Sequence, residues 1–173
     1  HLAKAAGFSK KTLVVHANRL INAVIEMLQS VGADVVHCPR SHAWFGHANF
    51  DCDRLAKAKV NICLGTDSLA STGGETAVTG LNMFAEMQEL SRNHPKLPCE
   101  DLLQMATANG ATALGLGDEI GLLKEGLIAN MAVIPYSDSA SSVPEAIVQH
   151  RRPVAMLMIE GKCAFSGIHS IVD

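Results

Sequence analysis

The chain is 173 residues long, which is enough for one ordinary domain with a buried core. Hydrophobic residues make up 48% and charged residues 18%, which excludes a disordered segment, and no apolar run approaches the roughly 18 residues of a membrane span. The formal charge is −3 with no basic stripe, so we expect neither nucleic acid nor a membrane as a partner. The five cysteines lack CxxC spacing, which argues against a disulfide framework or a zinc knuckle and favours a reducing compartment.

The first half of the chain predicts three short β-strands, over residues 12–16, 34–39 and 60–64. The gaps between them are long enough for crossover helices, so we expect parallel strands whose carboxyl ends lie at one edge of a sheet. Polar residues stand at or just after these ends: His16, His37 and Asp67. Barrels and open α/β sheets place their chemistry at this edge.

Helical spacing of apolar residues follows the first and third strands, over residues 20–28 and 81–88, with Thr79 as the expected N-cap of the second helix. A further helix is expected over residues 100–114, ended by Gly115 and Gly117. Pro39 is expected to stop the second strand and to begin a loop over residues 40–49.

The texture of the sequence changes after Gly126. Strands are expected over residues 131–135 and 154–159, with a serine-rich loop over 137–142 between them, and Gly161 turns the chain into a last apolar segment at 163–165. This tail predicts a small antiparallel appendage. We therefore divide the chain into residues 1–125 and residues 126–173.

The three strand-end residues are the candidates for chemistry. Imidazole nitrogens and a carboxylate suit a divalent transition metal, and a carboxylate beside a metal-bound water can shuttle a proton. The alternative is structural: His16 and His37 would hydrogen-bond their own loops, and Asp67 would cap the turn after Gly65. The residue types and their spacing leave both interpretations open.

Four motifs, in this order, strongly resemble the amidohydrolase superfamily. They are Val-Val-His-Ala-Asn (14–18), Val-Val-His-Cys-Pro-Arg-Ser-His (35–42), Cys-Leu-Gly-Thr-Asp-Ser (63–68) and Met-Ala-Thr-Ala-Asn-Gly-Ala-Thr-Ala-Leu-Gly (105–115). The match is to the aminohydrolase and chlorohydrolase branch, which includes guanine, cytosine, S-adenosylhomocysteine and aminofutalosine deaminases and triazine hydrolases. The resemblance covers nearly the whole chain, because residues 119–126 and 158–162 look like that family's return to its β-sandwich.

This resemblance implies an α/β fold: the C-terminal part of a (β/α)8 TIM-type barrel, about strands 6–8, in residues 1–125, and part of a small β-sandwich in 126–173. In the family, one divalent metal is held by a His-x-His after strand 1, a His after strand 5 and an Asp after strand 8, and a His after strand 6 polarises the substrate or the hydrolytic water. By motif, His16 corresponds to the strand 6 histidine and His37 lies at the end of strand 7. Asp67 corresponds to the strand 8 aspartate, both metal ligand and proton shuttle.

The sequence also departs from the family pattern. It contains no His-x-His and no His-x-x-Glu of the strand 5 type, whose glutamate would be the general acid/base. The His-Leu-Ala-Lys that begins at His1 resembles a strand 5 motif only superficially, because it lies too close to His16. One metal ligand of four is therefore present, so we expect this chain alone not to hold the metal, zinc or alternatively Fe²⁺. A whole barrel takes ~250 residues, and we expect the native protein to extend before His1.

The resemblance makes His16 and Asp67 the expected catalytic residues. Expected substrate contacts come from strand ends and the loops after them: His37, Ser41, His42 and Ser68. Ser41 keeps the serine of a Ser-Asn pair that is usual in this branch, and His42 replaces the asparagine. The alternative is that Trp44 and Phe45 plug the barrel mouth while the loop histidines are solvated.

The expected reaction is hydrolytic deamination of an amino-substituted nucleobase or purine nucleoside by a metal-bound hydroxide. Asp67 would accept the proton of the water, and His16 would hydrogen-bond the attacking oxygen or the developing oxyanion. Two alternatives stay open: a chlorohydrolase or cyclic amidohydrolase with the same machinery, and an incomplete, non-catalytic fragment or structural subunit. The expected partner is a small molecule, an aminopurine or related heterocycle, and the resemblance suggests a cytoplasmic homo-oligomer.

Overall fold

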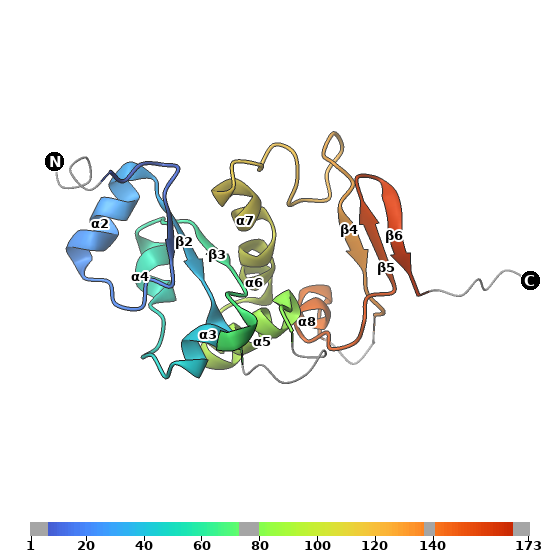
Figure 1. Ribbon diagram of the computed structural model, residues 1–173, viewed down its shortest axis with the longest axis horizontal. Coiled ribbons are helices and arrows are strands. Elements are labelled where there is room, and N and C mark those ends of the chain that lie inside the picture. The colour runs from blue at the N-terminus through green and yellow to red at the C-terminus, as the bar shows by residue number, and fades with distance from the viewer. Residues whose placement is uncertain (1–6, 73–79, 137–140, 168–173) are drawn as a thin grey trace, which may run out of the picture.

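A parallel sheet and an antiparallel sheet organise the two halves of the chain (Figure 1). The structure, a computed structural model, describes residues 7–72, 80–136 and 141–167. The parallel sheet contains, in this order, β1 (Leu13–Val15), β2 (Asp34–His37) and β3 (Ile62–Leu64). The antiparallel sheet contains, in this order, β4 (Met131–Val133), β5 (Met156–Ile159) and β6 (Lys162–Ser166).

The three predicted parallel strands are confirmed, and their carboxyl ends lie side by side. Val15 pairs with Val36, and His37 pairs with Leu64. The backbone continues this alignment beyond the strands, because the N–H of His16 donates to the carbonyl of Val36 at 2.8 Å and the N–H of Gly65 donates to that of His37 at 2.9 Å. The residues that follow β1 and β3 are thereby brought to one edge.

Helices cover the parallel sheet on both sides (Figure 1). On one side lie α2 (Asn22–Val31), which connects β1 to β2, and α4 (Cys52–Lys57), which leads into β3. On the other side α6 (Cys99–Ala106) and α7 (Ala108–Ala113) pack against β3. The core between these layers is fully buried and aliphatic, with Leu28, Val35, Leu55 and Leu102 each 0% exposed. This burial of apolar surface is the main force that holds the sheet and its helices together.

The connection after β2 differs from the prediction. Residues 40–49 were expected to form a loop, but α3 (Pro39–Trp44) occupies its first half. Pro39 is at the start of this helix, where the missing N–H costs nothing because the first turn leaves its N–H groups unbonded. The proline therefore ends the strand and begins a helix in a single step, which places the residues just after β2 on a rigid element.

The later helices also differ in detail. Thr79 lies outside the described residues, and the N-cap of α5 (Met83–Asn93) is Asn82, whose side-chain oxygen accepts from two backbone N–H groups of the first turn. The helix predicted over residues 100–114 is broken at Thr107, whose φ of −131° and ψ of −90° separate α6 from α7. Helix α4 lies in the gap where a crossover helix was expected without bounds, whereas α8 (Val143–Val148) was not predicted.

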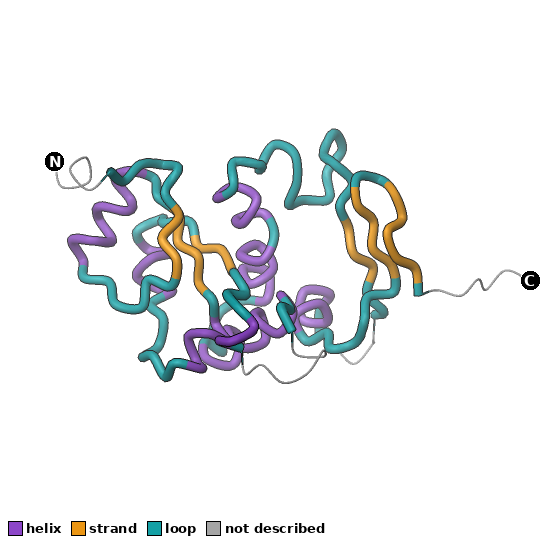
Figure 2. Tube along the Cα trace, viewed as in Figure 1, coloured by secondary structure: helices purple, strands orange, loops and turns teal. Residues whose placement is uncertain are grey.

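The antiparallel sheet is confirmed, and Gly161, at φ 75°, turns β5 into β6 as predicted. Of the serine-rich loop expected before it, residues 137–140 lie outside the described residues. Figure 2 shows helices on both sides of the parallel sheet and, in the described ranges, none on the outer side of the antiparallel one. Helix α8 packs against α5 and α6 and joins the two halves. No helix in the described ranges is long and apolar enough to cross a membrane.

Candidate active site

His16 and Asp67 meet at the carboxyl edge of the parallel sheet. His16 directly follows β1, and Asp67 lies in the turn after β3, so the two side chains approach each other across the end of β2. The Nε2 atom of His16 lies 4.0 Å from Oδ2 of Asp67, and the two side chains are 41% and 29% exposed. An imidazole and a carboxylate are thus paired at a position that solvent and a small molecule can reach.

Two serine hydroxyls hold the carboxylate of Asp67. The hydroxyl of Ser41, from α3, donates to Oδ2 at 2.6 Å, and that of Ser71, from the short helix η1 (Leu69–Ser71), donates to the same oxygen at 2.9 Å. Both serines are buried. These two hydrogen bonds lower the pKa of Asp67, the Ser41 bond most, and so favour its ionised form. The site therefore presents an ionised carboxylate in a fixed orientation.

Both candidate catalytic residues have a left-handed backbone. The φ angle is 70° at His16 and 55° at Asp67, a region that residues other than glycine rarely adopt. Such a conformation costs on the order of 1–3 kcal/mol and persists only where surrounding structure imposes it. Ala17, Lys59 and Glu160 adopt the same region, so the conformation marks tight turns of this chain and does not by itself separate a functional from a structural interpretation.

Gly65 lets the chain turn from β3 to Asp67. A Cβ atom at this position would lie 2.9 Å from Cγ1 of Val36 and 3.3 Å from Sγ of Cys38. The first distance is shorter than packed carbon atoms allow, because carbon pairs are at their best at about 3.5–4.0 Å. The close approach of the turn to β2 therefore requires glycine, and this approach sets where Asp67 stands.

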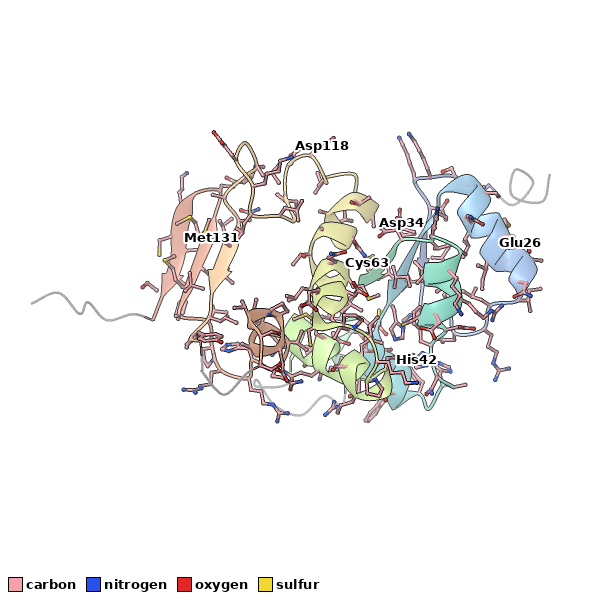
Figure 3. The ribbon with its side chains drawn as sticks, turned by 180° about the vertical axis from the view of Figure 1, so that it is seen from behind. Glu26, Asp34, His42, Cys63, Asp118 and Met131 are labelled. Atoms are coloured by element: carbon pink, nitrogen blue, oxygen red, sulfur yellow. The ribbon has the colours of Figure 1, made fainter. Side chains whose placement is uncertain are left out.

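A pocket of about 290 Å³ opens beside His16. Its lining residues come from the ends of β1 and β2: His16, Asn18, Ser41, His42, Phe45 and His47. Figure 3 shows His42 at the opposite end of the parallel sheet from Asp34, which begins β2. A volume of this size lies near the lower end of the range for small-molecule sites, about 300–1,000 Å³.

His42 is part of the pocket wall, and each of its ring nitrogens lies within hydrogen-bond distance of an oxygen atom. Its Nδ1 lies 2.9 Å from Oδ1 of Asn18, and its Nε2 lies 2.5 Å from the carbonyl oxygen of Ala48. Burial is the largest cause of a lowered pKa for this imidazole. His42 therefore ties the loop after β1 to the segment after α3, and its predicted contact with substrate stays a prediction.

The structure separates His37 and Ser68 from this pocket wall. His37 is 2% exposed, its ring stacks on that of Phe50 at 3.8 Å, and burial lowers its pKa to about 3. Its Nδ1 has no hydrogen-bond partner among the described residues. Ser68 is exposed, and its hydroxyl lies 3.2 Å from that of Ser71 within a reciprocal capping arrangement. Substrate contacts from these two residues stay predictions.

Sequence reasoning gave no individual role to Asn18, Ser71 or Arg40, whose contacts shape the site. The signal for Asn18 was its position two residues after His16, inside the first motif. Ser71 follows Ser68 by three residues, a spacing typical of reciprocal capping, but nothing local indicates that its hydroxyl reaches Asp67. Arg40 contacts Thr72, Gly80 and Glu86, which lie 32, 40 and 46 positions further along the chain.

The described residues fit one position of a metal site. Asp67 offers an ionised carboxylate, which is a suitable ligand for zinc or another divalent metal. Within residues 7–72, 80–136 and 141–167, no cluster of three or more histidine, cysteine, aspartate or glutamate side chains is placed to hold a metal ion. A tetrahedral site built on Asp67 therefore needs at least one further ligand from outside these ranges.

Comparison with known proteins agrees with this geometry. The model of the Amidohydrolase family matches residues 1–164. The 5-methylthioadenosine/S-adenosylhomocysteine deaminase of Pyrococcus furiosus is 35% identical over 127 residues, which are 73% of this chain and 30% of that protein. The protein of the same name from Pyrococcus horikoshii is 32% identical over 162 residues, 93% of this chain and 37% of that protein.

Among solved structures, an adenosine deaminase from Xanthomonas campestris with bound zinc superposes with a TM-score of 0.84 at 27% identity, covering 95% of this chain and 39% of that one. The chain thus spans about a third of the length of the curated relatives it matches. The family match extends over nearly all of its residues and includes the two strand ends that carry His16 and Asp67. The chain belongs to the amidohydrolase family.

Proposed function

We propose that the protein is a metal-dependent hydrolase that deaminates an amino-substituted purine nucleoside. The observation that carries this proposal is the carboxylate of Asp67, held by two hydroxyls 4.0 Å from the imidazole of His16 beside an open pocket. Relatives that are 32–35% identical are named as deaminases of 5-methylthioadenosine and S-adenosylhomocysteine. These names support our proposal that the substrates are adenosines with a substituent at the 5′ position.

We place β1, β2 and β3 as the sixth, seventh and eighth strands of a (β/α)8 barrel, and β4–β6 in a small β-sandwich, with the boundary after residue 125. The parallel register of β1–β3 and the superposition on an adenosine deaminase support this placement. In a barrel of this type the active site lies at the carboxyl ends of the strands, which is where His16 and Asp67 stand.

Asp67 would be the metal-binding residue in this proposal, and its Oδ2 atom already accepts both serine hydroxyls. The metal is zinc, as in the Xanthomonas campestris protein, with iron as the alternative, and when bound it lowers the pKa of a water molecule to near 7. At least one other ligand would come from outside the described residues. The serine hydroxyls keep the carboxylate in one orientation, which preorganises the site.

In the chemical step, Asp67 accepts a proton from the attacking water, and His16 donates a hydrogen bond from Nε2 to the attacking oxygen or to the oxyanion that develops. The heterocycle occupies the pocket between the loop after β1 and α3. Protonation of the ring nitrogen, which lets ammonia leave, requires an acid from outside the described residues.

The test is a substrate panel on the native protein that contains this chain, purified with zinc present. The panel contains 5′-methylthioadenosine, S-adenosylhomocysteine, adenosine and guanine, with a chlorotriazine and a cyclic amide as controls for other leaving groups. We expect stoichiometric ammonia from the adenosine derivatives. Chloride or ring-opened product in place of ammonia would favour the other hydrolases of the family, and no turnover of any compound would favour a non-catalytic role. The cytoplasmic location and the homo-oligomeric state stay predictions.

A further inference from the structure

Arg40 binds the backbone at two positions that follow Asp67 in the sequence, Thr72 and Gly80. Its side chain, 12% exposed, extends from α3. Nη2 donates to the carbonyl of Thr72 and Nη1 donates to the carbonyl of Gly80, each at 2.9 Å. One guanidinium group therefore holds two backbone positions that are separated by eight residues in the sequence, and both lie between Asp67 and α5.

Arg40 is itself anchored to α5 by a buried carboxylate. Its backbone N–H donates to Oε2 of Glu86 at 2.9 Å, and Nη1 lies 3.7 Å from Oε1 of the same residue. The Glu86 side chain is 0% exposed. Its burial raises its pKa to about 7 even though the neighbouring arginine acts in the opposite direction, so desolvation outweighs the attraction between the charges. Such a pair contributes little net stability, and a positional role explains its presence better.

Arg40 and one of its partners, Thr72, are the sequence neighbours of the two serines whose hydroxyls hold Asp67. Ser41 follows Arg40 in α3, and Ser71 immediately precedes Thr72, whose carbonyl Arg40 binds. Both hydroxyls donate to Oδ2 of Asp67. A shift of the Thr72 backbone by a few tenths of an ångström would move the Ser71 hydroxyl by a similar amount, because the two residues are adjacent in the chain.

We propose that Arg40 is a positioning residue for Asp67: by tying the backbone at Thr72 and Gly80 to α3, it keeps the hydroxyls of Ser41 and Ser71 on one oxygen of that carboxylate. The effect on turnover rests on the proposed function of Asp67, whereas the effect on the backbone does not. A guanidinium is suited to the task because its planar fork presents several N–H donors in fixed directions, which the single ammonium of a lysine does not do.

The first experiment is a double-mutant cycle on the purified, zinc-loaded protein. We expect Arg40→Met, which keeps the aliphatic stem and removes the donors, to lower kcat for 5′-methylthioadenosine about tenfold while KM changes less than about twofold. Arg40→Lys should restore only a small part of the loss. In a Ser41→Ala/Ser71→Ala background, Arg40→Met should lower kcat less than about twofold further, because the hydroxyls through which it acts are gone.

Arg54→Met is the matched control. Arg54 also binds a loop carbonyl from a helix, since its Nη1 donates to the carbonyl of Leu20 at 3.1 Å, but within the described part of the chain its hydrogen bonds are with Leu20, Asp51 and Asn22 and not with Asp67 or the two serines that hold it. Its loss should lower the thermal midpoint by an amount comparable to the loss of Arg40 and leave kcat unchanged. An equal fall of kcat in both variants, or an Arg40→Met effect that is as large in the double-alanine background as in the wild type, overturns the proposal.

Amide hydrogen exchange tests the same proposal without any activity. The N–H groups of Ser71 and Thr72 are bonded to the carbonyls of Ser68 and Leu69 in η1. Arg40→Met should raise exchange in a peptide that covers residues 68–72 at least about tenfold relative to the wild type and leave α4 unchanged. Unchanged exchange in residues 68–72 contradicts the positional role, even if the protein proves not to be a deaminase. Increased exchange without deaminase activity supports the positioning role of Arg40 and refutes only the proposed function.

Discussion

His16 and His37 stand at the ends of neighbouring strands, and the fold gives them opposite surroundings. His16 is 41% exposed, has a left-handed backbone and faces the carboxylate of Asp67. His37 is 2% exposed and stacked on Phe50. The strand order explains the contrast: β1 is at an edge of the described sheet, whereas β2 is central and its end is covered by α3 and the segment that follows. A histidine at a strand end is therefore not by that position alone a candidate catalytic residue. Solvent access and an ionised neighbour distinguish His16 from His37.

The strongest way to break this comparison is to replace each imidazole by the same amide. His16→Gln should lower kcat about 100-fold, because it replaces the imidazole that hydrogen-bonds the attacking oxygen. A loss of this size is in the range measured when one oxyanion-hole donor is removed. His37→Gln should change kcat less than about threefold, since the ring is buried and, among the described residues, its ring contact with the pocket wall is with His42. Steady-state kinetics on folded protein, checked by circular dichroism, decide the matter, and equal losses from both substitutions would refute it.

The two serine hydroxyls near Asp67 sharpen the comparison from the other side. Ser41→Ala should lower kcat about tenfold, because it removes a hydrogen bond to a charged group, and such bonds are worth about 1.5–3 kcal/mol. Ser30→Ala is the control, since the hydroxyl of Ser30 in α2 donates to the carbonyl of Met27 at 2.8 Å and not to the carboxylate of Asp67. Its kcat should stay within about twofold of the wild type. If the two alanine variants lose activity equally, the Ser41 hydrogen bond has no special role.

The smallest expected effect concerns stability against acid. The pKa of His37 is lowered from 6.5 to about 3, mainly by burial, so between these pH values the unfolded chain binds a proton that the native chain does not. Stability from this group is therefore constant above pH 6.5 and falls as the pH falls toward 3, by at most about 1.4 kcal/mol per pH unit.

His37→Phe, which keeps a ring against Phe50, should remove this dependence. Urea unfolding at pH 7 and pH 5 measures it: the difference in unfolding free energy between the two pH values should be smaller in the variant than in the wild type. A difference of the same size in both proteins would show that His37 takes no part in acid sensitivity.

The sheet and its active edge could be predicted from the sequence because they depend on local patterns. Runs of β-branched residues predict the strands, and the gaps between them require parallel crossovers, which brings His16 and Asp67 to the same edge. The helix α3 was missed because Pro39 is compatible both with the end of a strand and with the first turn of a helix. Only tertiary contacts choose between these outcomes.

The support around the site could not be predicted, because it is made of contacts between distant residues. Ser41 bonds to a carboxylate 26 positions away, and Arg40 binds carbonyls 32 and 40 positions away. Ser41 keeps the serine of the family motif and was therefore expected to contact the substrate. Its hydrogen bond to Asp67 becomes visible only in three dimensions. The burial of His37 is hidden for the same reason, since Phe50 stacks on it from beyond α3.

The most direct test of the account is the turnover of Asp67→Asn with 5′-methylthioadenosine and saturating zinc, beside Asp53→Asn, an exposed aspartate in α4, as the control. Asparagine keeps the shape and the acceptor oxygen for the serine hydroxyls but cannot accept a proton, and general-base catalysis contributes about 10²–10⁴-fold. We expect kcat to fall about 1,000-fold or more in Asp67→Asn and to be unchanged in Asp53→Asn. Turnover within about tenfold of the wild type in Asp67→Asn would contradict the assignment of this edge of the sheet as the hydrolytic centre.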